Sequence, residues 1–98
     1  MTKVYYHATP FENLTSIMER GIHTGYDGYV YLTEKPEEAA RFVVIRGYNE
    51  ILVLGVEIED DMVEESFDHN PVFFGCNAYM YPLNIPSECI TEYYKYEK

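Results

Sequence analysis

Four side chains carry groups that can bind or activate a small ligand. They are the imidazole of His7, the hydroxyls of Thr9 and Tyr31, and the carboxylate of Asp68. An imidazole titrates near neutral pH and can both donate and accept hydrogen bonds. A carboxylate can act as a general base or stabilise positive charge as it develops. These four residues are therefore the candidates for a binding or catalytic site.

Each candidate also has a structural explanation. His7 ends a predicted strand, where an imidazole often hydrogen-bonds a neighbouring turn. Thr9 begins the stretch TPFE, which has the pattern of a capping box at the start of a helix. Tyr31 fits the packing of an aromatic strand. Asp68 precedes His69, but adjacent residues of an extended segment point to opposite sides, which favours turn roles over a catalytic pair.

No metal site is predicted. The histidines and cysteines show no ligand spacing of a known kind. These residues are His7, His23, His69, Cys76 and Cys89.

Hydrophobic periodicity and turn residues predict two early helices and several strands. The expected strands are 3–7, 29–33, 51–58, 78–81 and 89–96, and the expected helices are 10–20 and 37–46. Gly21 is the expected end of the first helix. The acidic stretch 59–65 is expected to interrupt the regular secondary structure. Residues 66–77 are expected to form an irregular loop, and residues 85–88 a turn. This order indicates an α+β fold, and the length indicates a single domain over residues 1–98.

The charge of the chain restricts its partners. Seventeen acidic residues against seven basic ones give a formal net charge of −10, and the basic residues are scattered. A nucleic-acid backbone would be repelled, so direct nucleic-acid binding is not expected. No stretch approaches the roughly 20 apolar residues that span a bilayer, and no signal peptide is recognised. We therefore expect a cytoplasmic protein with no membrane contact.

Three stretches together resemble the ADP-ribosyltransferase-fold family. YYHATPFENLTSIMERGI is similar to the family's opening, in which a strand ends in His-x-Thr and runs into a helix closed by Gly-Ile. GYVYLTEKPEEAARF is similar to its second motif, a strand with a tyrosine, then Ser or Thr, then an alanine-rich helix. YMYPLNIPSECI resembles the third region, which the related RNA 2′-phosphotransferases share. The resemblance covers nearly the whole chain in the right order, although each motif alone is weak.

The resemblance implies a fold, a ligand and a reaction. The fold would be a small, split and bent mixed or antiparallel sheet with both helices in the N-terminal half. The ligand would be NAD, used as a substrate whose ADP-ribose is transferred to a protein or nucleic-acid acceptor. His7 would hydrogen-bond the adenosine-side ribose with Thr9 close by, and Tyr31 would stack on the nicotinamide. A cleft lined by these residues would be closed by the loop that contains Asp68.

The acid that the family places on its later strand is missing. It should fall within Tyr79–Tyr81, where Met80 occupies the central position. A preorganised carboxylate is the group best able to favour the positive charge that cleavage leaves on the ribose. Asp68 is the main substitute and Glu88 a weaker one. Alternatively, the chain uses a divergent set without an acid, or its pocket holds a nucleotide-like ligand or nothing.

Two further hypotheses concern the function of the chain. The RNA 2′-phosphotransferase branch is disfavoured because it needs a second histidine where Tyr31 stands and arginines for the substrate phosphate, and the chain has only Arg20, Arg41 and Arg46. The alternative to an enzyme is a pseudoenzyme on the same fold. Such a protein would use its acidic surface to block a partner with a basic, nucleic-acid-binding surface.

Overall fold

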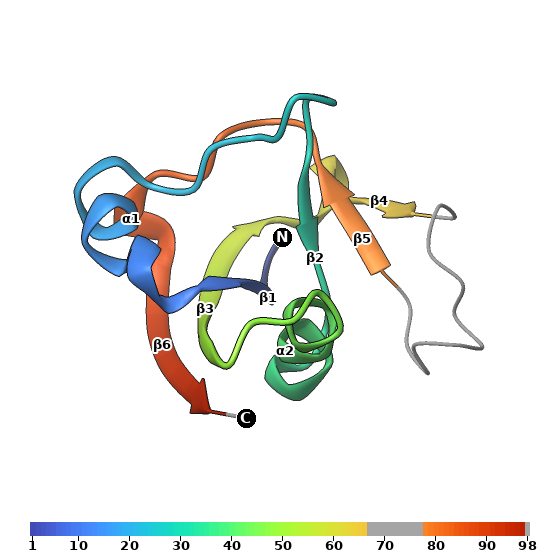
Figure 1. Cartoon of the computed structure of the whole chain (residues 1–98). Coiled ribbons are helices and arrows are strands. Elements are labelled where there is room, and N and C mark those ends of the chain that lie inside the picture. The colour runs from blue at the N-terminus through green and yellow to red at the C-terminus, as the bar shows by residue number, and fades with distance from the viewer. Residues whose placement is uncertain (67–77, 98) are drawn as a thin grey trace.

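The computed structural model describes residues 1–66 and 78–97, and in them two antiparallel sheets are accompanied by two helices (Figure 1). The strands are β1 (Thr2–Pro10), β2 (Val30–Leu32), β3 (Glu50–Glu59), β4 (Glu64–Ser66), β5 (Ala78–Tyr81) and β6 (Ile90–Glu97). The helices are α1 (Leu14–Arg20) and α2 (Pro36–Val44), and short 3-10 turns lie at η1 (Phe11–Asn13), η2 (Asp60–Met62) and η3 (Ser87–Cys89). The predicted α+β class is confirmed.

The first sheet has the order β1-β3-β6, with β3 in the centre. β1 pairs along it from Thr2↔Glu59 to Pro10↔Ile51, and β6 pairs along its other edge. Ile51, Leu52, Val53, Leu54 and Val56 of β3 are completely buried. A continuous apolar run of this kind is typical of a strand covered on both faces. The prediction of a central strand at 51–58 is confirmed.

The second sheet has shorter strands in the order β2-β5-β4. Met80 in the middle strand pairs with Tyr31 on one side and with Glu64 on the other. The two sheets are joined where Tyr6 and Thr33 exchange backbone hydrogen bonds of 2.8 and 2.9 Å. The strands therefore follow one another as β4-β5-β2-β1-β3-β6, with a change of sheet between β2 and β1.

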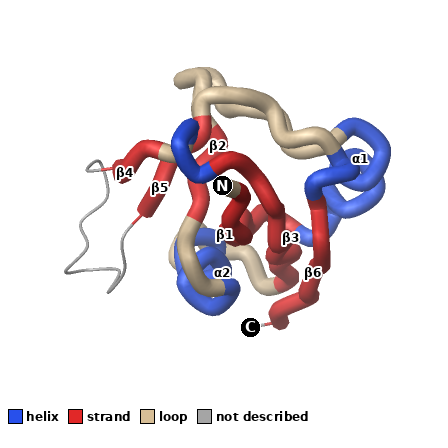
Figure 2. Tube along the Cα trace, turned by 180° about the vertical axis from the view of Figure 1, so that it is seen from behind, coloured by secondary structure: helices blue, strands red, loops and turns tan. Residues whose placement is uncertain are grey.

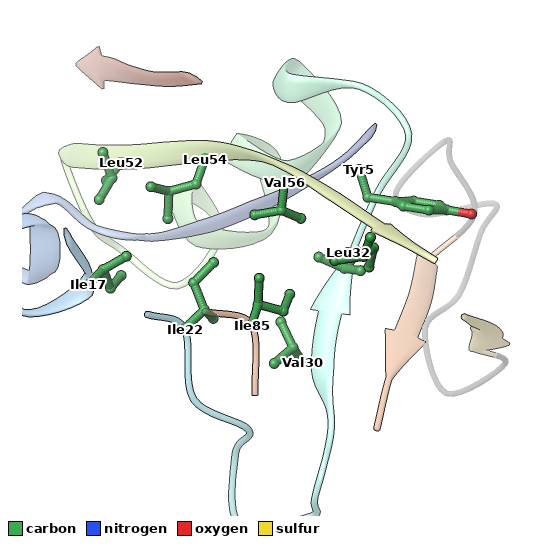
Figure 3. Close-up of a cluster of buried hydrophobic side chains, with 10 residues drawn as sticks. Tyr5, Ile17, Ile22, Val30, Leu32, Leu52, Leu54, Val56 and Ile85 are labelled. Carbon is green, nitrogen blue, oxygen red and sulfur yellow. The ribbon is translucent and has the colours of Figure 1, made fainter. Parts of the chain in front are cut away.

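The two faces of the first sheet have separate apolar clusters. Leu52, Leu54 and Val56 point from β3 toward Ile22 and Ile85, which lie beneath that strand (Figure 3). The larger cluster consists of Tyr5, Ile17, Ile22, Val30, Leu32, Leu52, Leu54, Val56, Ile58 and Ile85. The smaller cluster, on the opposite face and under α2, consists of Ala39, Ala40, Val43, Ile51 and Val53. Figures 1 and 2 place α1 on the β6 side and β4 and β5 on the other side.

Gly21 ends α1 as the sequence predicts. Its φ of 80° lies in the left-handed region, which glycine adopts without a steric penalty. A Cβ there would also lie 2.3 Å from the backbone oxygen of Ile85. Ile22 then exchanges two backbone hydrogen bonds of 2.8 Å with Ile85. The glycine thus allows the chain after α1 to lie directly against the segment before β6.

The predicted start of the first helix is wrong. β1 continues to Pro10, whose backbone is extended at ψ 140°, and α1 begins only at Leu14 after the η1 turn. No side chain caps either turn of this segment. The capping box therefore does not form, because pairing of Pro10 with Ile51 keeps the chain extended past Thr9.

The other boundaries show smaller differences. α2 spans Pro36–Val44 where the sequence predicts a helix over 37–46, and β5 matches the predicted strand 78–81. The acidic stretch 59–65 is not a simple break, because Glu64–Ser66 pairs with β5 as β4. The predicted loop 66–77 lies almost wholly outside the described residues. No helix within residues 1–66 and 78–97 is long and apolar enough to cross a membrane.

Candidate functional site

His7 lies on β1 opposite Leu54 and contacts the neighbouring sheet. Its Nδ1 is 2.9 Å from the backbone carbonyl oxygen of Tyr31. Burial lowers the pKa of the imidazole below its ordinary value of 6.5, and the carbonyl opposes this effect more weakly. The ring is therefore neutral at pH 7. Because a carbonyl only accepts, Nδ1 carries the proton and Nε2 is left as an acceptor.

Two pockets share His7. The apolar pocket, of about 270 Å³, lies between β1, β2 and α2, and the polar pocket, of about 290 Å³, lies between β1 and α1. The apolar pocket is lined by Tyr6, His7, Ala8, Tyr31, Leu32, Thr33, Ala39, Phe42, Val43, Ile45, Arg46 and Ala78. The polar pocket is lined by His7, Thr9, Asn13, Ser16, Ile17, Arg20, Gly21, Ile22 and His23.

Tyr31 lines the apolar pocket from β2. Val30 and Leu32 are buried on the other face of the strand, so the tyrosine lies on the face that carries the pocket. Its hydroxyl donates a hydrogen bond to the carboxylate of Asp27, which also accepts from the backbone N–H of Tyr29 at 3.3 Å. The Tyr31 hydroxyl holds the pKa of the Asp27 carboxyl below its ordinary value. Asp27 thereby orients the aromatic ring.

Thr9 lies in the polar pocket, two residues after His7 on the same face of β1. Its Oγ1 accepts a hydrogen bond of 2.8 Å from the side-chain amide of Asn13. The predicted helix-capping role is therefore wrong. A threonine hydroxyl that accepts in this way still has a proton to donate to a ligand.

A polar stripe on the α1 segment was not singled out in the sequence. Asn13, Ser16 and Arg20 are spaced at i, i+3 and i+7, which places them on one side of a helix. This spacing was the available signal, and the structure places all three along the polar pocket with His23. Among the described residues the lining contains the guanidinium of Arg20 and no carboxylate, although the whole chain has a net charge of −10.

Asp27 was also missed, because the stretch GYDG reads only as a turn. Residues 26–28 form a turn before β2, so the contact of Asp27 with Tyr31 depends on that turn and has no periodic signal in the sequence. The described structure therefore brings His7, Thr9 and Tyr31 to two adjoining pockets, and it adds Asp27 as the hydrogen-bond partner of Tyr31.

The predicted acids are not part of this arrangement. Asp68 lies outside the described residues. Glu88 is exposed in η3, and it lines neither pocket. Met80, which occupies the place of the missing acid, stands directly opposite Tyr31.

One group of acids within the described residues has carboxylates close enough to share a metal ion. Glu59, Asp60 and Asp61 lie in an exposed turn, with ligand atoms within 4.8 Å of one another. Glu59 pairs with Thr2 at the far end of β1, five residues from His7. At about 3.4 Å per residue this separation is about 17 Å. The acidic turn is therefore distinct from the two pockets.

No family model matches the chain, and no curated protein resembles it significantly. The chemistry of the pockets therefore has to be argued from their own residues.

Proposed function

We propose that the chain binds NAD across the two pockets and transfers its ADP-ribose to an acceptor. The observation that carries this proposal is the position of His7 between an apolar pocket with aromatic side chains and a polar pocket without carboxylates. NAD has a flat nicotinamide ring at one end and a ribose, two phosphates and adenine toward the other. A ligand with this division of polarity matches the division between the pockets.

Each pocket residue then has a physical role. Tyr31 and Phe42 offer aromatic surface for the nicotinamide ring. Nε2 of neutral His7 accepts a hydrogen bond from a ribose hydroxyl, and the hydroxyl of Thr9 is available beside it. The guanidinium of Arg20 at the polar pocket favours phosphate. The strands change from one sheet to the other between β2 and β1, as expected for a split sheet. This change supports the ADP-ribosyltransferase-like fold that the three motifs imply.

The proposal is tested by NAD binding and nicotinamide release. Saturation at about 100 times Kd stabilises the folded state by about 2.7 kcal/mol. For a domain of this size that raises Tm by about 10 °C or more. We expect His7→Ala and Tyr31→Ala to remove most of this shift and the release of nicotinamide. Tyr93→Ala is the matched control, because Tyr93 is 52% exposed on β6 and lines neither pocket.

The outcomes separate binding from catalysis. A wild-type chain without a thermal shift would remove the proposed ligand. A shift and turnover that are unchanged in both pocket variants would remove the proposed site. Binding without nicotinamide release would reduce the function to that of an NAD-binding pseudoenzyme.

One observation favours the second candidate, a protein that blocks a basic partner. Glu57, Glu59, Asp60, Asp61, Glu64 and Glu65 are all exposed along one stretch of chain. Such a stretch attracts a basic surface over about a Debye length, so complex formation weakens as salt rises. Polylysine is a suitable probe. Salt-sensitive binding that is lost in a Glu59→Gln, Asp60→Asn, Asp61→Asn variant supports this candidate, and salt-insensitive binding together with strong NAD stabilisation contradicts it.

A further inference from the structure

The apolar pocket has a charged side chain in its lining that the proposed function does not use. Among the described residues that line this pocket, Arg46 alone is charged at pH 7, since His7 is neutral. Arg46 lies just after α2 and is exposed to solvent. Its guanidinium has no ion-pair or hydrogen-bond partner within residues 1–66 and 78–97. It is therefore available to an anionic group on a ligand.

The rest of the lining suits a flat apolar ring. Tyr6, Tyr31 and Phe42 contribute aromatic side chains, and aliphatic side chains form most of the remaining wall. Aromatic rings pack favourably on one another in offset or edge-to-face arrangements. The volume of about 270 Å³ is slightly below the range typical of drug-sized ligands. Because an apolar cavity of about 150 Å³ can already hold benzene, the pocket has room for one substituted ring.

We infer that the apolar pocket binds a small planar aromatic carboxylate, with its ring against Tyr31 and Phe42 and its carboxylate on Arg46. A carboxylate accepts two parallel hydrogen bonds from a guanidinium, whereas a carboxamide of nearly the same shape has no charge to pair with it. No acidic side chain of the described residues lines the pocket. The net charge of −10 is spread over the whole chain, and salt screens exposed charges beyond about 8 Å at physiological ionic strength.

This ligand goes beyond the proposed dinucleotide, although both use the aromatic side chains of the same pocket. A free aromatic carboxylate competes with the nicotinamide ring of NAD for the surface of Tyr31. It leaves the polar pocket, with Thr9 and Arg20, open. The inference concerns the apolar pocket alone and does not depend on the transfer of ADP-ribose.

A purely structural role of Arg46 predicts a different result. A positive charge close to the C-terminus of a helix stabilises the helix through its dipole. Loss of that effect lowers the stability of the ligand-free protein. It does not change the relative affinity for two ligands of the same shape. The ratio of two affinities therefore distinguishes recognition of an anion from support of α2.

The test uses benzoate and benzamide, which have the same ring and nearly the same shape but differ in charge. Calorimetric titration of the full chain at low salt gives both dissociation constants. We expect the wild type to bind benzoate about 10-fold more tightly than benzamide. In Arg46→Gln the two affinities should become equal. Arg41→Gln is the matched control and should keep the preference, because it removes the same charge from α2 at a residue that lines neither pocket.

Three results overturn the inference. The first is equal affinity of the wild type for benzoate and benzamide, and the second is a preference for benzoate that persists in Arg46→Gln. The third is equal or tighter binding of cyclohexanecarboxylate, which has the charge of benzoate but no flat ring. The NAD-dependent thermal shift tests the proposed function separately. A shift without the benzoate preference leaves only the proposed function standing, and the preference without a shift leaves only this inference.

Discussion

The two sheets of this protein differ in how their strands are buried. β3 of the first sheet is apolar and buried over the six successive positions 51–56 and is covered on both faces. The second sheet is built from strands of three or four residues, and its outer face carries Tyr31, Met80 and Glu64. The first sheet therefore supplies most of the buried area that stabilises the fold. The second can present polar and aromatic groups because less of the core depends on it.

The contrast extends to the candidate site. His7 belongs to the first sheet and Tyr31 to the second, and the hydrogen bond between them crosses the junction. A ligand that contacts both pockets would therefore hold the two sheets together. The following substitutions test this division of roles, beginning with the largest effect.

Leu54→Ala should be the most destabilising. Leu54 is completely buried in β3, and the loss of its side chain leaves a cavity. We expect the free energy of unfolding to fall by about 2 to 5 kcal/mol, measured by denaturant titration. Met80→Ala on β5 should cost about 1 kcal/mol, since Met80 is only partly buried. Equal losses would show that the second sheet is as much a part of the core as the first.

Gly21→Ala should be next. Its Cβ would meet the backbone oxygen of Ile85 at 2.3 Å, and its φ is positive. We expect a loss of about 2 to 3 kcal/mol, because the clash adds to the backbone strain. Gly28→Ala is the control, since Gly28 has φ 87° but no atom within 4 Å of a Cβ. It should lose only about 1 kcal/mol. Similar losses in both would show that the close approach to Ile85 is unimportant.

A smaller effect should appear as a dependence on pH. The folded state holds the pKa of His7 below its unfolded value of 6.5, so the unfolded chain binds more protons below neutral pH. The stabilisation by the neutral ring is complete above pH 6.5 and is lost as the pH falls toward the folded pKa. We expect wild-type stability to fall more than that of His7→Asn between pH 7.5 and 5.5. Parallel curves for the two proteins would contradict a partly buried, neutral His7.

Tyr31→Phe should have the smallest effect on folding. It removes the hydrogen bond to Asp27 on an exposed surface, which costs about 0.5 to 1 kcal/mol. The ring remains, so nicotinamide stacking should persist and the NAD-dependent thermal shift should fall only slightly. Loss of the whole shift would show that the hydroxyl, and not the ring, is the group that matters.

Several features could be predicted from the sequence because local chemistry determines them. The run at 51–58 is too apolar and β-branched to be anything but a buried element. Pro36 and the alanine-rich segment after it favour a helix, and Gly21 suits the end of another. His7, Thr9 and Tyr31 stand out as reactive or polar groups beside these elements.

The errors have a common cause. The stretch TPFE has a helix-start pattern, but pairing of Pro10 with Ile51 keeps it in the strand. Glu64–Ser66 has little strand propensity, yet it forms β4 by pairing with β5. In both cases hydrogen bonds to a strand distant in sequence outweigh the local preference.

The amino-acid sequence by itself determined which segments are apolar, where glycine or proline interrupts them, and which side chains could contact a ligand. Only the tertiary structure decided that His7 donates to the carbonyl of Tyr31 and lies between two pockets of opposite character. It alone aligned Tyr31, Met80 and Glu64 in one row. The physical reason is that strand register depends on pairing between distant segments, and a shift of one residue would turn each side chain to the other face.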